Sequence, residues 1–231
     1  MSKDANAALK SNRISSAQRA YQGMREQLLR FEIHPGQKIN EVTMAARLET
    51  SRTPLREALS RMVAEGLLVT GDRGFAVPDL EPETVQGLFE ARLELECSMA
   101  RLACERATPE ALAALSEFLT ESAAESPNAS VDRLMELDIK FHDSIAAMSG
   151  NEALRAMLAN VNDRIYLVRW IAMEGRRNST QAQHREILEC VMRGDKQGAS
   201  EVMRNHIMHR NDEILAAIKS AYGHVFTMGS N

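Results

Sequence analysis

The pattern of apolar and polar residues changes once along the chain, near residue 80. From residue 83 onward, apolar positions recur three and four residues apart, which is typical of amphipathic helices, and prolines and glycines interrupt them. This pattern predicts helices over residues 83–106, 109–124, 131–149, 151–173, 178–193 and 196–222. Because the connections are short, consecutive helices are expected to run antiparallel and to form an all-helical bundle.

The first part of the chain mixes helices with a small amount of strand. Helices are expected over residues 15–30, over residues 41–49 and from Thr53 onward. A short turn separates the second helix from the third, which is typical of a helix–turn–helix. The next segment, LLVTGDRGFAV, holds two short apolar runs around Gly71 and Gly74 and predicts a β-hairpin. Together these elements predict a winged helix-turn-helix.

These two patterns define the expected domain organisation. The fold class is mostly α, with an N-terminal winged helix-turn-helix domain and a C-terminal antiparallel bundle of about six helices. No apolar run approaches the roughly 20 residues of a membrane span, and no signal peptide is visible at the N-terminus. A disordered lead-in is expected over residues 1–13 and the winged domain over residues 14–79. The helical domain is expected over residues 80–225, and a tail over residues 226–231.

Composition agrees with a helical protein and indicates its compartment. Of the 231 residues, 44% are hydrophobic but only 4% are aromatic, which favours helices over sheets. The three cysteines, Cys97, Cys104 and Cys190, are an odd number without CxxC spacing, so free thiols in a reducing cytoplasm are expected. Cys97 and Cys104 are seven residues apart on one helix face and are expected in the core.

Charge is divided unevenly between the two parts of the chain. Residues 1–79 carry 12 Lys and Arg against 9 Asp and Glu, a net charge of +3. Residues 80–231 carry 16 against 23, a net charge of −7. A polyanion is therefore expected to approach the first part and not the second.

Two arginines stand at a helix start, where positive charge is unfavourable. Thr53 is expected to cap the third helix and Pro54 to take its first position, which places Arg52 just before the helix and Arg56 in its first turn. Each cation at this positive helix end costs roughly 0.3–1 kcal/mol. DNA phosphates would offset that cost, and arginine also reads guanine in the major groove. The alternative is that both arginines pair with neighbouring glutamates at the surface.

The same segment resembles the DNA-binding domain of the GntR family of bacterial transcriptional regulators. The resemblance rests on SRTPLREALSRMVAEGLLV, on the upstream PGQKINE and on the later RGFAV. Glu49 and Thr50 stand where the family often has Gly-Val. By this resemblance, and with Arg61 added from further along the same helix, the residues expected to contact DNA are Arg52, Thr53, Arg56, Arg61, Arg73 and Gly74.

Four polar side chains fall on the apolar faces of helices in the second part. Asp138 and His142 are four residues apart beside a stripe that includes Phe141, and His184 and His206 also share faces with apolar residues. A buried aspartate is costly unless it is paired or bound to a metal, and imidazole with carboxylate suits Zn, Ni, Mn or Fe. The pattern alone leaves two interpretations open: a divalent-metal site, or a hydrogen-bonded polar network in the core.

Residues 83–220 are similar to the FCD effector domain of the FadR-type branch of GntR regulators. The matching segments are ARLELE, DIKFHDSIAAMSGNEAL and QHREILECVMRGDKQGASEVMRNHI. This resemblance implies that a small carboxylate effector completes the coordination of a divalent metal, with zinc as the first expectation and nickel, manganese or iron as alternatives. The four ligands it implies are Asp138, His142, His184 and His206.

Arg92 also matches the pattern of that branch. A guanidinium is well shaped to pair with an effector carboxylate, and this is the role expected for Arg92. The alternative is an ordinary pair with Glu96 on the helix surface, worth roughly 0.3–0.5 kcal/mol.

The sequence as a whole predicts a homodimeric regulator that binds a double-stranded DNA operator. A small organic acid, bound at the metal site, is expected to control the affinity for the operator. Two alternatives use the same centre: a metal-dependent hydrolase that activates water, and a regulator for which the metal itself is the signal. No clear general base stands beside the proposed ligands, which disfavours the hydrolase.

Overall fold

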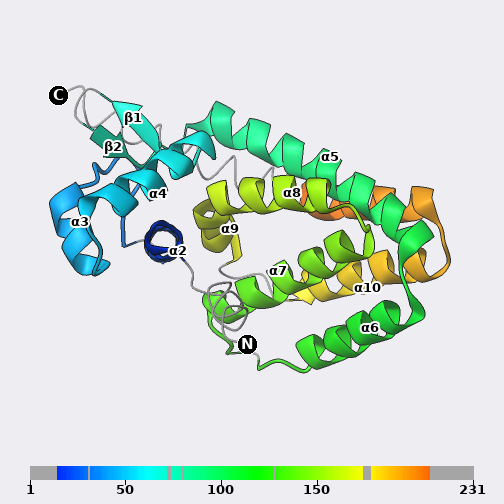
Figure 1. Ribbon diagram of the computed structural model, residues 1–231. Coiled ribbons are helices and arrows are strands. Elements are labelled where there is room, and N and C mark those ends of the chain that lie inside the picture. The colour runs from blue at the N-terminus through cyan, green and yellow to red at the C-terminus, as the bar shows by residue number, and fades with distance from the viewer. Residues whose placement is uncertain are drawn as a thin grey trace, which may run out of the picture. The chain divides into compact units, whose positions relative to one another are not determined.

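The computed structural model divides into two compact units after Asp79, and each unit is described by itself (Figure 1). The structure describes residues 15–30, 32–71, 74–79, 81–126, 128–173 and 178–208. The predictions for the lead-in, for the tail and for residues 209–222 of the last helix lie outside the described residues.

The first unit is a winged helix-turn-helix, as predicted. Strands β1 and β2 pair antiparallel with Thr70 opposite Phe75, and a single antiparallel bridge joins Lys38 to Ala76. The segment before α3 therefore adds a third short edge to the wing. The elements are α2 (Ser16–Leu29), α3 (Glu41–Arg47), α4 (Arg52–Ala64), β1 (Val69–Gly71) and β2 (Gly74–Ala76).

The core of this unit lies where α2 packs on α4. Met24 of α2 and Leu55, Leu59 and Met62 of α4 are completely buried. The three residues of α4 recur at intervals of three and four, so one face of this helix is anchored and the opposite face is free to meet a ligand.

The start of α4 differs from the prediction. The helix begins at Arg52, and Ser51 is its extended N-cap residue, without a hydrogen bond from the Ser51 side chain. Thr53 is therefore not the cap, and Pro54 occupies the third helical position. Proline did not mark the start because all the first-turn N–H groups lack helical partners, so its missing N–H is tolerated beyond the first position. Arg52 is consequently the first helical residue, and Arg56 lies in the second turn.

The turn between α3 and α4 contains Glu49, which stands where the GntR pattern often has glycine. Glu49 has a φ of 49°, in the left-handed region. This conformation costs a residue with a Cβ atom about 1–2 kcal/mol but is open to glycine. The turn therefore keeps the geometry that glycine would favour, although glutamate occupies the position.

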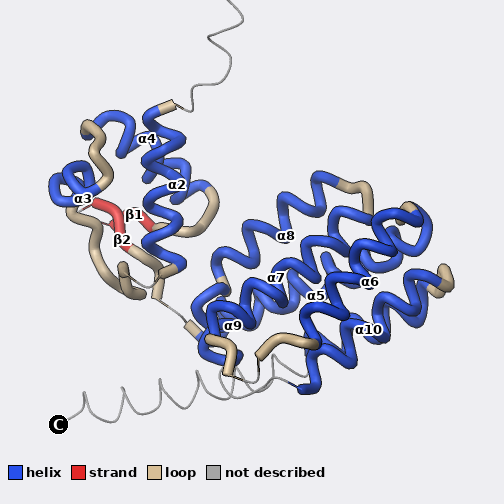
Figure 2. The backbone as a smooth tube through the Cα atoms, turned by 90° about the horizontal axis from the view of Figure 1, so that it is seen from below, coloured by secondary structure: helices blue, strands red, loops and turns tan. Residues whose placement is uncertain are grey.

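The second unit is an all-helical bundle, also as predicted (Figures 1 and 2). Helix α5 packs against α7, α8 and α10, and α7 also contacts α6 and α9. None of the described helices is long and apolar enough to cross a membrane. The helices are α5 (Pro82–Arg106), α6 (Pro109–Ala123), α7 (Val131–Met148), α8 (Glu152–Arg164), α9 (Tyr166–Met173) and α10 (Asn178–Met192), followed by a helical stretch over residues 196–208.

One predicted helix is two helices. The sequence pattern predicts a continuous helix over residues 151–173, but α8 ends before Ile165, which has a φ of −103° and is completely buried. Neither proline nor glycine marks this break, and apolar residues continue on both sides of it. The break directs α9 against α7, and this contact brings Arg169 to the centre described below.

The bundle core contains Cys97, as predicted, and Cys104 packs against that core but is only half-buried. Cys97 and Cys190 are buried, Cys104 is half-buried, and all three are free thiols. Burial raises the pKa of each thiol above its usual range. The three cysteines therefore act as small apolar residues and not as reactive groups.

Candidate metal centre and nucleic-acid interface

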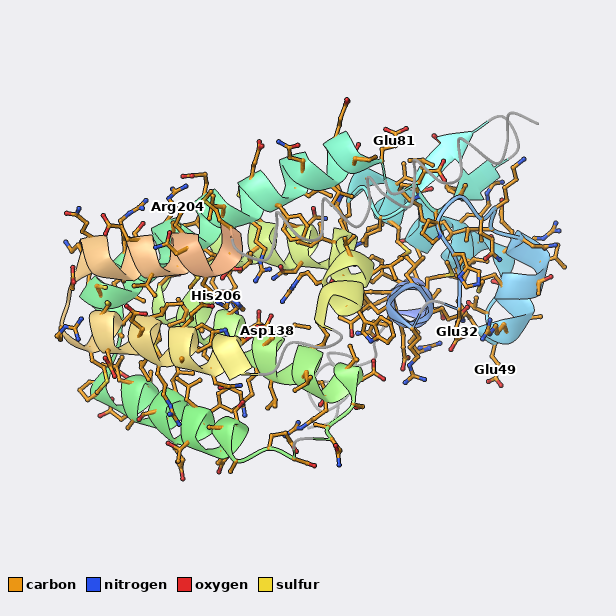
Figure 3. All side chains as sticks on the ribbon, turned by 180° about the vertical axis from the view of Figure 1, so that it is seen from behind. Glu32, Glu49, Glu81, Asp138, Arg204 and His206 are labelled. Carbon is orange, nitrogen blue, oxygen red and sulfur yellow. The ribbon has the colours of Figure 1, made fainter. Side chains whose placement is uncertain are left out.

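Three segments of the bundle bring the four predicted ligands together. Asp138 and His142 lie one turn apart on α7, His184 lies on α10, and His206 lies on the stretch over residues 196–208. All four side chains are 1–3% exposed. In Figure 3, Asp138 and His206 lie between the helices, whereas Arg204 lies on the outside of the bundle. The inward orientation predicted from helical spacing is therefore observed.

The donor atoms converge on one point. The Nε2 atom of His206 lies 3.2 Å from Nε2 of His184 and 3.3 Å from Nε2 of His142. The Oδ1 atom of Asp138 lies 3.5 Å from Nε2 of His184 and 3.9 Å from Nε2 of His142. A tetrahedral zinc ion lies about 2.0–2.1 Å from nitrogen ligands, which separates those ligands by roughly 3.3 Å. Both the donor set and its spacing therefore fit a divalent transition metal.

Hydrogen-bond partners on the far side of two imidazoles fix where their protons lie. Nδ1 of His142 donates to a carboxylate oxygen of Glu96, because a carboxylate can only accept. Nδ1 of His206 lies 2.9 Å from Oε1 of Gln183 and donates to it. When both rings are neutral, their Nε2 atoms therefore carry lone pairs, and these two atoms face each other at 3.3 Å. Two lone pairs make no hydrogen bond, whereas a shared cation would satisfy both.

Glu96 connects His142 to Arg92. The Nε atom of Arg92 donates to Oε1 of Glu96 at 2.6 Å, and both side chains are only 2% exposed. Burial raises the pKa of Glu96, but the interactions of its carboxylate with Arg92 and His142 outweigh burial and lower the pKa to about 2. The Arg92–Glu96 pair that the sequence offered as the alternative is thus formed, but in the core and not on the helix surface.

Arg169 holds Asp138, the candidate carboxylate ligand, from the other side. Its Nη2 atom donates to Oδ2 of Asp138 at 2.8 Å, and its Nη1 atom donates to Asn162 at 3.1 Å. Burial and the nearby charge of Arg92 lower the pKa of Arg169 to about 10, so this guanidinium remains charged at neutral pH. The Oδ1 atom of Asp138 is left facing the imidazoles.

Three residues that hydrogen-bond to the candidate ligands were not predicted from sequence. These are Glu96, which contacts His142, Gln183, which contacts His206, and Arg169, which contacts Asp138. Arg169 carried a usable signal, because it is a lone cation within the apolar helix YLVRWIAM. Gln183 carried none, since it directly precedes His184 and resembles any polar surface residue.

The predicted DNA-contacting residues of α4 lie on its exposed face. Arg52 and Thr53 are exposed at the start of the helix. Arg56 is 64% exposed and lies 3.3 Å from Glu41 of α3, a loose ion pair at the surface. Gly74 is exposed at the start of β2 with a φ of 109°, and Arg73 lies outside the described residues.

Arg61 is held within the winged domain. Its Nε atom donates to Glu65 at 2.9 Å, its Nη1 atom donates to Gln18 at 2.8 Å, and its guanidinium lies 4.0 Å from the ring centre of Tyr21. These contacts join α4 to α2. The described geometry gives Arg61 a structural role, and its contact with DNA stays a prediction.

Both units match known family models. Residues 16–77 match the model of bacterial regulatory proteins of the gntR family, and residues 87–209 match that of the FCD domain. The chain belongs to the GntR family and carries an FCD domain. Family membership follows because the FCD model covers more than half of the chain and because full-length relatives are similar over most of it.

Curated relatives of this GntR-family protein are transcriptional regulators. The Nta operon transcriptional regulator of Aminobacter aminovorans is 38% identical over 202 residues, which cover 87% of this chain and 95% of the relative. The HTH-type transcriptional repressor GlaR of Escherichia coli K12 is 29% identical over 199 residues, covering 81% and 90%. This GntR-family protein is therefore a DNA-binding transcriptional regulator and not an enzyme.

A solved structure supports the fold. The E. coli protein McbR/YncC shares 24% identity and has a TM-score of 0.75, with 90% of this chain and all of that chain covered. At this level of identity the similarity concerns the architecture, a winged domain followed by a helical bundle, and not the ligand.

Proposed function

We propose that this regulator holds one divalent metal at Asp138, His142, His184 and His206, and that a small carboxylate bound there controls its affinity for an operator. The observation that carries the proposal is the convergence of the Nε2 atoms of His142 and His206, whose protons are committed to Glu96 and Gln183. Zinc suits three imidazoles and a carboxylate best, and nickel, manganese and iron accept the same donors.

With four protein ligands, a bound metal would have to become five- or six-coordinate, and it would then supply a Lewis-acidic position for an effector carboxylate. The protein supplies the remaining interactions. Arg169 orients Asp138, and Glu96 orients His142. Arg92 adds a buried guanidinium for the effector carboxylate, since its Nη2 atom has no hydrogen-bond partner among the described residues.

The location of the centre suggests how the signal begins. The proposed ligands come from α7, α10 and the stretch over residues 196–208. An effector that coordinates the metal would therefore change the position of three segments at once. We place this regulator in the cytoplasm as a homodimer, in which the effector favours one arrangement of the paired DNA-binding domains over another. Its operator is then expected to be nearly palindromic.

Operator binding with and without metal tests the proposal. An operator is first obtained by selection from random double-stranded DNA, and its dissociation constant is then measured with metal-loaded and chelator-stripped protein. In the presence of zinc, at least one small carboxylate is expected to change operator affinity by about 5–150-fold, the usual range of coupling between two sites. The stripped protein should show no response to the same acid.

Two other outcomes would overturn parts of this account. An equal response to the acid in stripped protein means that the effector acts without the metal. A response to zinc alone, with no further change from any acid, means that the metal itself is the signal. Either result leaves the DNA-binding assignment intact, because operator binding is measured in every arm.

Arg52→Ala is expected to weaken operator binding by about 1–3 kcal/mol if Arg52 reads a base. If it contacts only phosphate, the salt dependence of binding should instead become shallower by about one unit. Arg56→Ala should behave similarly, because its loose pair with Glu41 leaves the guanidinium 64% exposed. Fluorescence anisotropy over a range of salt concentrations measures both effects.

Arg155→Ala is the matched control for these two variants. Arg155 is an exposed arginine of α8 in the other unit and pairs with Glu152 of the same helix. Its substitution should leave both affinity and salt slope unchanged. If the variants of Arg52 and Arg56 match this control, α4 is not the recognition helix.

A further inference from the structure

Two buried guanidiniums flank the four-ligand cluster. Arg92 comes from α5 and Arg169 from α9, and they are 2% and 3% exposed. Arg169 reaches the cluster through Asp138, and Arg92 reaches it through Glu96, which contacts His142. Two different helices thus each bring a positive charge to the same centre.

Each guanidinium has one N–H group for which no described residue provides an acceptor. Among the described residues, Nη2 of Arg92 and Nε of Arg169 are buried and have no hydrogen-bond acceptor. A buried donor without an acceptor is destabilising, and more so when the group is charged. Two separate acceptors would therefore stabilise the centre, one for each arginine.

The charges of the centre balance without a metal and do not balance with one. Apart from the histidines, the buried charged side chains among the described residues are Arg92, Glu96, Asp138 and Arg169, and their formal charges sum to zero. Asp143, the next acidic residue along α7, is exposed. A divalent ion bound by neutral imidazoles adds two positive charges, which nothing else buried in this part of the chain offsets. Buried net charge is costly, and a ligand with two negative charges would balance it.

We infer that the effector is a dicarboxylate and that Arg92 and Arg169 together select it over monocarboxylates. This inference rests on the proposed function, since it concerns the ligand of the same metal site. A dicarboxylate offers both negative charges and an acceptor for each of the two unsatisfied N–H groups. A monocarboxylate leaves one positive charge uncompensated and one guanidinium N–H group without an acceptor.

Matched pairs of acids test the inference on zinc-loaded full-length protein. Each pair has the same chain length: malonate and propionate, succinate and butyrate, glutarate and pentanoate. Isothermal titration calorimetry is expected to show, for at least one pair, a dissociation constant at least tenfold lower for the dicarboxylate. If every pair agrees within threefold, the dicarboxylate assignment is wrong while the proposed carboxylate function stands. If no acid binds, both fail.

Variants of Arg92 show whether the guanidinium causes the preference. Arg92→Met keeps a long side chain without charge, and the ratio of the two dissociation constants should fall below threefold. Arg92→Lys keeps the charge and should retain most of the preference. Arg101→Met, an exposed arginine of α5 hydrogen-bonded to Ser98 and Ser200, is the control and should not change the ratio.

These variants have clear contrary outcomes. A full preference in Arg92→Met shows that Arg92 does not select the second carboxylate. If Arg92→Met does not fold, as judged by circular dichroism, Arg92→Gln replaces it, because glutamine is polar but uncharged and should also bring the ratio below threefold. A full preference in folded Arg92→Gln overturns the role of Arg92.

Discussion

Replacement of Glu96 by alanine is expected to lower the free energy of unfolding of the helical unit by about 3–5 kcal/mol. Glu96 is the only carboxylate that contacts Arg92 among the described residues, and both are buried. Removing one member of a buried ion pair leaves the other charge without compensation, which is the costly case for such pairs. Denaturant unfolding of metal-free protein, followed by far-ultraviolet circular dichroism, measures the loss.

Glu94→Ala is a closely matched control. Glu94 lies two residues away on α5 but faces outward, where its 67% exposed carboxylate pairs with Arg204 at 2.9 Å. An exposed pair of this kind contributes at most about 1 kcal/mol. If the two variants lose equal stability, Glu96 is not the compensating charge that the geometry indicates.

Glu96→Gln separates the two functions of this residue. Glutamine keeps the volume and the oxygen that can accept from Arg92 or His142, but it lacks the negative charge. Loss of an outer partner of a metal-binding histidine typically lowers metal affinity by about 10–100-fold. Glu96→Gln keeps an acceptor for His142 and loses only the charge, so it is expected to weaken zinc binding by no more than this range. A zinc affinity equal to that of wild type would show that the charge of Glu96 does not support metal binding.

The inward positions of the four candidate ligands could be predicted from sequence because helical periodicity determines which residues face inward. Asp138 and His142 lie beside the stripe that contains Phe141, and His184 lies four residues before Leu188 on a buried face. A residue in such a stripe points inward whatever the neighbouring helices are. The ligands were accessible to sequence analysis for this reason.

The residues that hydrogen-bond to the candidate ligands are brought there by helix packing, which helical periodicity does not specify. The contact between Glu96 and His142 joins α5 to α7 across 46 residues of sequence. Arg169 reaches Asp138 only because the chain bends at Ile165, and no proline or glycine announces that bend. Sequence analysis identified Arg92 and Glu96 as neighbours on one helix but could not show that α7 buries them.

The DNA-binding face illustrates a different limit. The family pattern located α4, but local signals misplaced its first residue, because both Ser51 and Thr53 are residue types that cap helices. The observed helix start at Arg52 strengthens the argument that the beginning of α4 attracts a phosphate. Arg52 is the first residue of α4, so its backbone lies at the positive end of the helix dipole. A DNA phosphate at this end would be attracted both by the helix dipole and by the guanidinium of Arg52.

His184→Ala is expected to remove most of the metal-dependent stability of the protein. His184 supplies the one ligand from α10, and its Nε2 atom lies close to both Asp138 and His206. Zinc at 100 times its dissociation constant should stabilise the wild-type protein by about 2.7 kcal/mol. If loss of one ligand weakens binding about 100-fold, the same zinc concentration stabilises the variant by only about 0.4 kcal/mol.

The difference between metal-loaded and metal-free unfolding is the relevant measurement, because His184 also stacks on Phe141 with ring centres 3.7 Å apart. Losing that contact lowers the stability of both forms and cancels in the difference. His34→Ala, a change at an exposed histidine of the winged domain, should keep the full metal increment. Elemental analysis of protein purified without a histidine tag should find one divalent ion in the control and little in His184→Ala. An undiminished increment in His184→Ala would show that the four residues form a polar network and that any metal binds elsewhere.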